Sequence, residues 1–169
     1  MYMLKRALRP LLLSSMAVLS VPSLQAAEVI RHKIPNSDFP ISLAIEIPAG
    51  TTLVNLSGAV PPAIDAKADP TSVAAYGNTE TQTVSVLKSI RATLETLGLG
   101  LGDVVKMQVY LVGSAEMGGK MDYAGFMRGY TQFFGTPQQQ NLPTRSVFQV
   151  AALANPGYRV EIEVSAVRR

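Results

Sequence analysis

Alternating hydrophobic and polar residues predict strands along much of the chain. The clearest run spans 104–112, where Val105, Met107, Val109 and Leu111 alternate with more polar positions, as in a strand with one buried face. Similar patterns predict strands at these further ranges: 29–35, 42–48, 53–58, 145–153 and 158–167. A short Gly-Thr-Thr turn separates 42–48 from 53–58, which predicts that these two strands pair as a hairpin.

Two other segments have hydrophobic residues at helical spacing. The first helix is expected to begin at a cap, Asn78 or Thr79, and to end at Gly98. Its predicted buried face consists of Leu87, Ile90, Leu94 and Leu97. The second helix is expected over 121–134, with an aromatic and Met-containing set predicted to pack in the core: Tyr123, Phe126, Met127, Tyr130, Phe133 and Phe134.

The order of these elements is β-β-β-α-β-α-β-β, with a long loop rich in Pro, Ala and Asp at 59–78. This order predicts an α+β fold in which two helices pack on one face of a single mixed sheet. We expect the other face of the sheet to be solvated or covered by another subunit.

The first 27 residues have the composition of a secretory signal. Basic residues at 5, 6 and 9 precede an apolar run, PLLLSSMAVLSV, and the segment ends in small residues. The apolar run is shorter than the ~20 residues needed to cross a bilayer. We therefore expect cleavage after Ala26 or Ala27, a folded domain over 28–169, and a periplasmic or secreted location.

Removal of that segment changes the charge balance of the protein. The full chain has 15 basic and 12 acidic residues, and three of the basic residues lie in the first 27. The remaining chain has 12 of each, so its net charge is zero. A neutral domain argues against nucleic acid or an anionic membrane as the partner.

The chain has no cysteine and one histidine, His32. The missing thiols exclude a disulfide framework, a thiolate metal site and a cysteine nucleophile. A single histidine makes a multi-histidine metal site or a Ser-His-Asp triad unexpected, and we expect His32 to be a solvated strand residue. Chemistry must then come from Arg, Glu, Asp, Ser, Tyr or backbone groups.

Three charged residues near the C-terminus form the best candidate constellation. Glu161 and Glu163 share one face of the last predicted strand, about 7 Å apart. Arg145 begins the preceding strand, which we expect to neighbour the last one. A guanidinium matches a carboxylate in shape and charge, so Arg145 forms either an ion pair with one of these glutamates or a site for an anionic ligand.

Four segments together resemble the Rid family, formerly called YjgF, of imine and enamine deaminases: TQTVSVLKSIRATLETLGLGLGDVVKMQVYL, YAGFMRGYTQFFG, LPTRSVFQVAAL and VEIEVSAVRR. The resemblance covers about residues 40–169. It implies a chorismate-mutase-like fold and a homotrimer whose sheet faces form a central barrel, with clefts between subunits.

The resemblance also implies roles for individual residues. Arg145 would clamp the carboxylate of a 2-imino or enamino acid, and the backbone N–H of Val147 would help to hold it. Glu161 would orient a water molecule for hydrolysis, and Ser57 matches a serine of the early strand. The implied reaction yields a 2-keto acid and ammonia and uses neither a metal nor an organic cofactor.

The chain departs from the pattern of this family at three positions. Ile41 stands where a tyrosine is typical, Met127 where an asparagine is expected, and Val147 where a cysteine is common. We therefore expect a more apolar site than usual. The alternatives are a non-catalytic trimeric module that binds small carboxylates and, as a third reading, a chaperone-like interaction protein.

The signal segment gives a testable prediction. We expect the intact mass of the exported protein to correspond to a chain that lacks residues 1–26 or 1–27. A mass that retains the whole segment would contradict the predicted cleavage.

Overall fold

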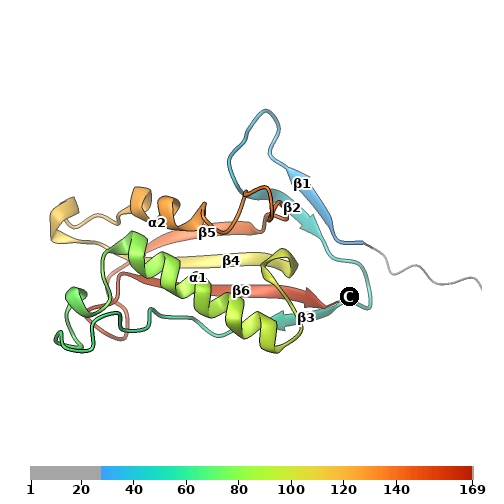
Figure 1. The fold of residues 1–169 in the computed structure, drawn as a ribbon. Coiled ribbons are helices and arrows are strands. Elements are labelled where there is room, and N and C mark those ends of the chain that lie inside the picture. Colours follow the sequence, from blue (N-terminus) through green and yellow to red (C-terminus); the bar gives the residue numbers. More distant parts are fainter. Residues whose placement is uncertain (1–27, 169) are drawn as a thin grey trace, which may run out of the picture.

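A computed structural model describes residues 28–168, arranged as a layer of helices against a layer of strands (Figure 1). The strands are β1 (Ile30–Lys33), β2 (Ser42–Glu46), β3 (Thr52–Asn55), β4 (Val104–Val112), β5 (Thr144–Val150) and β6 (Val160–Arg168). The main helices are α1 (Thr79–Thr96) and α2 (Tyr123–Tyr130). The predicted order of elements is confirmed. The predicted signal segment lies outside the described residues.

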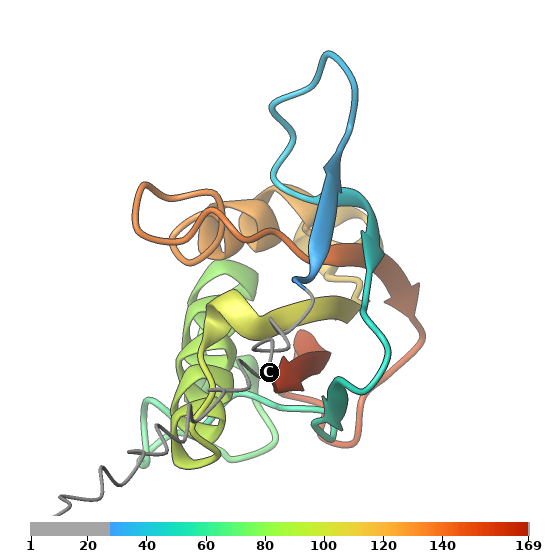
Figure 2. The same ribbon diagram turned by 90° about the vertical axis from the view of Figure 1, so that its right-hand side faces the viewer.

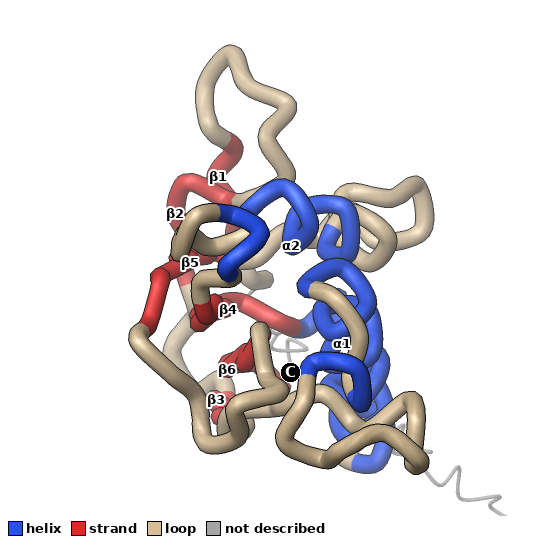
Figure 3. Tube along the Cα trace, turned by 90° about the vertical axis from the view of Figure 1, so that its left-hand side faces the viewer, coloured by secondary structure: helices blue, strands red, loops and turns tan. Residues whose placement is uncertain are grey.

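The central sheet has four strands in the order β3-β6-β4-β5. β4 pairs antiparallel with β6 and parallel with β5, so the sheet is mixed, as predicted. Both helices cover the same face of this sheet, as Figures 2 and 3 show. The predicted fold class is therefore confirmed, and it matches the chorismate-mutase-like fold that the resemblance implies.

The N-terminal strands do not pair as the sequence predicts. β2 pairs with β1 in a separate two-stranded ladder, whereas β3 pairs with β6. The predicted hairpin of 42–48 with 53–58 is therefore wrong, and the predicted single sheet is divided in two. β2 lies beside the β5 edge, where Ser42 N–H donates to the Pro143 carbonyl at 2.9 Å, and the chain then crosses to the opposite edge.

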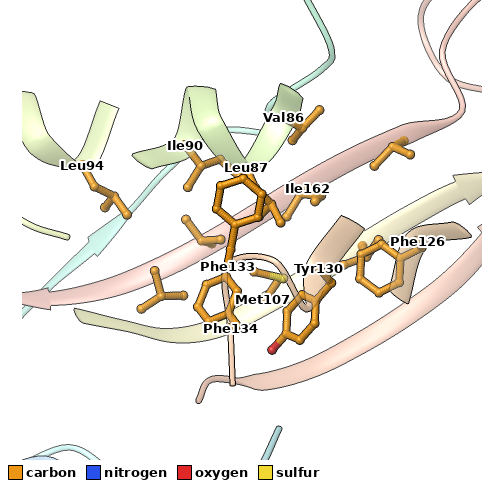
Figure 4. Packing of buried hydrophobic residues seen from close by; sticks show 14 of the residues in the cluster. Val86, Leu87, Ile90, Leu94, Met107, Phe126, Tyr130, Phe133, Phe134 and Ile162 are labelled. Carbon is orange, nitrogen blue, oxygen red and sulfur yellow. The ribbon is translucent and has the colours of Figure 1, made fainter. Parts of the chain in front are cut away.

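The core lies between the helices and the central sheet (Figure 4). Alternate residues of β6 are buried against the helices, as predicted: Val160, Ile162, Val164 and Ala166. The residues between them face the other side of the sheet. There Val167 is also buried, because it packs with Val29, Val105 and Ile45 in a second small cluster.

Helix α1 begins and ends as the sequence predicts. The Asn78 side chain accepts a hydrogen bond from Thr81 N–H at 2.9 Å, and Gly98 has a φ of 70°, a conformation that favours glycine. Three of the four predicted core leucines and isoleucines are buried. Leu97 is 41% exposed, because the helix has already ended at Thr96 and no longer directs that side chain inward.

Helix α2 is shorter than predicted. Asp122 caps it by accepting a hydrogen bond from Gly125 N–H at 2.8 Å, and the helix ends at Tyr130. Phe133 and Phe134 are buried in the turns that follow. Tyr123 is 36% exposed and Met127 is only partly buried, so these two members of the predicted core set lie at its margin.

The two helices approach closely at Gly129, which gives a stability prediction. A Cβ atom at Gly129 would lie 2.7 Å from Cβ of Thr83 and 3.1 Å from the Glu80 carbonyl oxygen. We expect Gly129→Ala to lower the free energy of unfolding by about 1–3 kcal/mol, because the helices must separate. Chemical denaturation measures this change.

Gly100→Ala is the matched control. An added Cβ at Gly100 meets no atom within 4 Å, and the φ of −137° suits other residues. We expect a change of less than about 0.5 kcal/mol for this variant. Equal effects of the two substitutions would rule out steric crowding at the helix crossing as the cause.

Candidate functional site

Arg145 is the second residue of β5 and points towards the helices. It lies opposite Met107 in the parallel register, and Met107 is fully buried on the helix face. The predicted neighbour of this strand is wrong, because β4 separates β5 from β6. The short sequence separation of the last two strands suggested adjacency, but a connection of this length can also pass over an intervening strand.

The positions of the charged residues also exclude the predicted ion pair within one chain. Glu161 and Glu163 face away from the helices, opposite Tyr110 and Gln108 respectively in the antiparallel register. Arg145 faces the helices, so the sheet itself separates the guanidinium from both carboxylates. The predicted ion pair of Arg145 with Glu161 or Glu163 of the same chain is therefore wrong, and a site for an anionic ligand stays a prediction.

Three aromatic rings surround the Arg145 guanidinium. Its central carbon lies 4.1 Å from the ring centroid of Tyr130, 5.1 Å from that of Phe126 and 5.5 Å from that of Phe39. We call these three rings the aromatic cage. Each distance lies within the range of a cation–π interaction, so the cage attracts the cation without neutralising its charge.

Polar contacts of Arg145 are few. Nη2 donates to the Tyr123 hydroxyl and to Met127 Sδ, each at 3.3 Å. Nη1 is buried and has no hydrogen-bond partner. Within residues 28–168, ion pairs form between His32 and Glu46, Arg91 and Glu95, and Arg128 and Glu80, and none involves Arg145.

Burial lowers the pKa of Arg145 from its ordinary value, and electrostatic attraction to Tyr130 and Tyr123 opposes that change. Because a guanidinium loses its proton only far above neutral pH, the group remains charged at neutral pH. The site therefore holds a half-buried cation with one unpaired donor. An uncompensated buried charge is costly, so an anion that enters this position is favoured.

Local sequence explains how the cage forms. The α2 side chains that contact Arg145 are three to four residues apart, so they lie on one face of the helix, towards β5. They are Tyr123, Phe126, Met127 and Tyr130. Phe39 comes from the loop between β1 and β2. That loop is held by the Tyr130 hydroxyl, which donates to the Pro40 carbonyl at 2.8 Å; burial raises the pKa of Tyr130, so the hydroxyl keeps its proton.

A cavity of about 290 Å³ lies beside Arg145, between β2 and the ends of β4 and β5. Its lining residues are Ile34, Ile41, Ser42, Leu43, Lys106, Met107, Thr144, Arg145 and Ser146. The lining contains no acidic side chain. Of the three residues that depart from the family pattern, Ile41 lines this cavity together with Arg145, and Met127 contacts the guanidinium.

Val147 lies two residues after Arg145 on the same side of β5. It is opposite Val109 in the register, and its partly buried side chain packs against the core. The predicted pair Arg145 and Val147 is therefore brought together by the alternation of a single strand.

Glu161 and the segment around Ser57 form a second group, on another part of the sheet. Ala59 pairs with Ile162 as an isolated bridge, which places Ser57 and Gly58 alongside β6. Any side chain at Gly58 would overlap the Glu161 carboxylate, so glycine is required for the carboxylate to lie there. Ser57 itself is exposed.

The two glutamates have different surroundings. Glu163 Oε2 accepts a hydrogen bond from the Tyr110 hydroxyl at 3.0 Å, and this bond raises the pKa of Tyr110. In the described part of the chain, the Glu161 carboxylate makes no hydrogen bond or ion pair. Of these two glutamates, Glu163 is therefore the one whose carboxylate is held by a neighbouring side chain.

Sequence reasoning assigned the cage rings of α2 to the core and did not single out Phe39. The helical spacing of the aromatic residues was visible, but an aromatic stripe usually packs against aliphatic side chains. An arginine on the strand that the aromatic residues cover is the signal that distinguishes a cage of this kind from an ordinary core.

His32 lies on exposed β1 as predicted, and its Nε2 is 2.7 Å from Glu46 Oε1.

Residues 28–168 contain no group of three His, Asp or Glu side chains placed to hold a metal ion. Over the same range, none of the helices has both the length and the hydrophobicity that a membrane span requires.

Comparison with known proteins gives one family. The sequence pattern of the Endoribonuclease L-PSP family matches residues 34–168. A protein named 2-iminobutanoate/2-iminopropanoate deaminase, from Salmonella typhimurium, is 31% identical over 118 residues, which cover 70% of this chain and 81% of that protein. TdcF of Escherichia coli is 37% identical over 82 residues, or 48% of this chain. That match spans only 57% of TdcF.

Solved structures agree on the fold. A crystal structure of Escherichia coli TdcF with bound serine has a TM-score of 0.54 at 30% identity, covering 73% of this chain and 85% of TdcF. The Rid protein YyfB of Yersinia pestis has a TM-score of 0.61 over 82% of this chain and 96% of its own, and at 24% identity this similarity concerns the fold alone.

Proposed function

Because the chain belongs to the Endoribonuclease L-PSP family, which is the Rid or YjgF family, we propose that it hydrolyses small 2-imino or enamino carboxylic acids. The products are a 2-keto acid and ammonia. The name of the Salmonella relative supports this substrate class, and the serine bound to TdcF supports a small carboxylate as ligand. The balance of 12 basic and 12 acidic residues in 28–169 gives no support to RNA as the substrate.

The observation that carries this proposal is the state of Arg145. Its guanidinium is held by aromatic rings, pairs with no carboxylate among residues 28–168, and has one buried donor without a partner. A ligand carboxylate would supply two acceptors for the planar fork of the guanidinium. The Val147 N–H is the further donor that we propose for this carboxylate.

The hydrolysis needs one more group, a base for water, and we propose Glu161 for this role. Glu161 takes a proton from water as the water oxygen attacks the carbon of the protonated imine. The resulting tetrahedral carbon bears a hydroxyl and an amine. Glu161 then gives its proton to the amine, ammonia leaves as the C–N bond breaks, and the hydroxyl proton passes to the Glu161 carboxylate and on to water, which leaves the keto acid and the original base. Every atom comes from substrate and water, so no cofactor is required.

Arg145 and Glu161 must come from different copies of the chain. Within one chain they lie on opposite faces of the sheet, so one copy cannot present both to the same small molecule. We propose a homotrimer in which Arg145 and Val147 of one copy face Glu161 and Ser57 of the next. The open face of the sheet, where Phe148 is 47% exposed, would then be covered by neighbouring copies.

The alternative function is a carboxylate-binding module without turnover. The observation in its favour is that Met127 Sδ contacts the guanidinium at 3.3 Å, at a position where the family pattern has an asparagine. A thioether is a weak acceptor and would not orient a polar substrate group as an amide does.

We further propose export to the periplasm or the exterior, on the sequence pattern of residues 1–27.

Two variants test the reaction. Ammonia release is measured from imines that an amino-acid oxidase generates in the cuvette. We expect Arg145→Ala to lower kcat/KM about 100-fold or more, because the clamp is lost. We expect Glu161→Gln to lower kcat about 10²–10⁴-fold, because the general base is lost, while the affinity for a 2-keto acid changes little.

Arg145→Met is the control for folding, since methionine can fill the cage without a charge. If wild type and all three variants release ammonia at the same rate, the deaminase function is wrong. If wild type releases none above background but binds a 2-keto acid in calorimetry, and Arg145→Met does not, the binding module is the correct function.

Mixed trimers test the shared site. At random assembly of equal amounts of Arg145→Ala and Glu161→Gln chains, about a quarter of the sites would combine an intact arginine with an intact glutamate. We expect co-refolded mixtures to regain about a quarter of wild-type activity, whereas each variant refolded alone regains none. Failure of the mixture to regain activity, with the trimer mass confirmed, would contradict a site divided between copies.

A further inference from the structure

We propose that Met127 is an oxidation site that regulates the grip of Arg145: peroxide converts its thioether to a sulfoxide, whose oxygen takes the place of the ligand carboxylate on the guanidinium. This inference deepens the proposed function, since it concerns regulation of the same site and rests on the binding of a carboxylate to Arg145. It begins from an atom that the proposed hydrolysis does not use, the sulfur of Met127.

The Met127 sulfur lies against the cation. Arg145 Nη2 donates to Met127 Sδ at 3.3 Å, and Nη1 of the same guanidinium is buried without a hydrogen-bond partner. A thioether is a weak acceptor, so this contact does little to satisfy the donors. A stronger acceptor at the end of the same side chain would pair with the donors that a ligand carboxylate otherwise reaches.

Oxidation by peroxide supplies such an acceptor. The sulfur lone pair attacks one oxygen of hydrogen peroxide and the O–O bond breaks. The second oxygen takes up the proton of the first and leaves as water. Sulfur is thereby oxidised by two electrons and peroxide is reduced. The product, methionine sulfoxide, carries a polar oxygen on a side chain that was apolar. The chain has no cysteine, so no thiol competes for the oxidant.

The surroundings of the methionines single out Met127. The described part of the chain contains four methionines. Met107 is fully buried, and Met117 is 46% exposed in the connection that follows β4. Met121 and Met127 are partly buried, and of the four it is the Met127 sulfur that contacts Arg145. Oxidation at Met127 therefore changes the surroundings of the cation directly.

The oxidant can reach this sulfur along the way that a ligand takes. Tyr123, one helical turn before Met127, is 36% exposed, and its hydroxyl accepts from the same Nη2 at 3.3 Å. The Nη2 side of the guanidinium therefore lies near the surface. Hydrogen peroxide is smaller than any 2-keto acid, so a site that admits the acid also admits the oxidant.

The sulfoxide would compete with the ligand. A methionine side chain has three rotatable bonds, so its oxygen can turn to Nη2 or to Nη1 and form a charge-assisted hydrogen bond. A hydrogen bond to a charged group is worth roughly a tenfold to hundredfold change in an equilibrium constant. The carboxylate must displace this bond in order to bind, so oxidation weakens its binding.

The test measures binding of 2-oxobutanoate by calorimetry, on the mature chain before and after treatment with hydrogen peroxide. Peroxide is removed by gel filtration before the keto acid is added, because it would decarboxylate that acid. We expect the peptide that contains Met127 to gain the mass of one oxygen atom and the Kd to rise about tenfold or more. Methionine sulfoxide reductases should restore the original Kd.

Two variants provide the controls, each compared with itself before and after peroxide. Met127→Leu cannot form a sulfoxide at this position, and we expect its Kd to stay within about twofold of its own untreated value. Met117→Leu removes the exposed methionine that lies elsewhere, and it should respond to peroxide as wild type does.

The outcomes separate this inference from the function on which it rests. If Met127 stays unoxidised in the folded protein, if its oxidation leaves the Kd unchanged or lowers it, or if Met127→Leu responds as wild type does, the regulatory role of Met127 is wrong while the carboxylate clamp stands. An untreated wild-type protein that does not bind 2-oxobutanoate, or an Arg145→Met variant that binds it as tightly, contradicts the clamp and the inference together.

Discussion

Each strand of the central sheet places successive side chains on opposite faces, and this constraint decides where every candidate residue lies. In β6 it buries Val160 and Ile162 against the helices and turns Glu161 to the open side. In β5 it turns Arg145 to the helices. The cation and the carboxylate that hydrolysis would need are thus kept apart by the backbone itself. The site that we propose between copies would satisfy both the alternation and the proposed chemistry.

Features that depend on local alternation and helical spacing were predicted correctly from the sequence. The pairing of strands that are distant in the sequence was not. The order of all eight elements, the cap at Asn78 and the buried face of β6 followed from local patterns. The partners of 42–48 and of the Arg145 strand did not, because strand pairing depends on tertiary packing that no short window contains. The same limit explains the cage, since the sequence presents the α2 aromatics but not the guanidinium they enclose.

The contacts of Arg145 link three segments that are remote in the sequence. The loop before β2 supplies Phe39, α2 supplies Phe126 and Tyr130, and β5 supplies the cation. Tyr130 joins these parts twice, through its ring to the guanidinium and through its hydroxyl to Pro40. The N-terminal ladder, which stands apart from the central sheet, is therefore fixed in place at the site where a ligand would bind.

The choice of arginine for this position has a consequence for the conditions under which the protein can work. A histidine in such a cage would lose its charge near neutrality, and a buried lysine could lose it a few pH units below its ordinary value. The guanidinium keeps its charge even though burial lowers its pKa. The export that we propose would expose the protein to the pH of its surroundings, and the charge of Arg145, which binding of a carboxylate would need, would then stay constant as that pH changed.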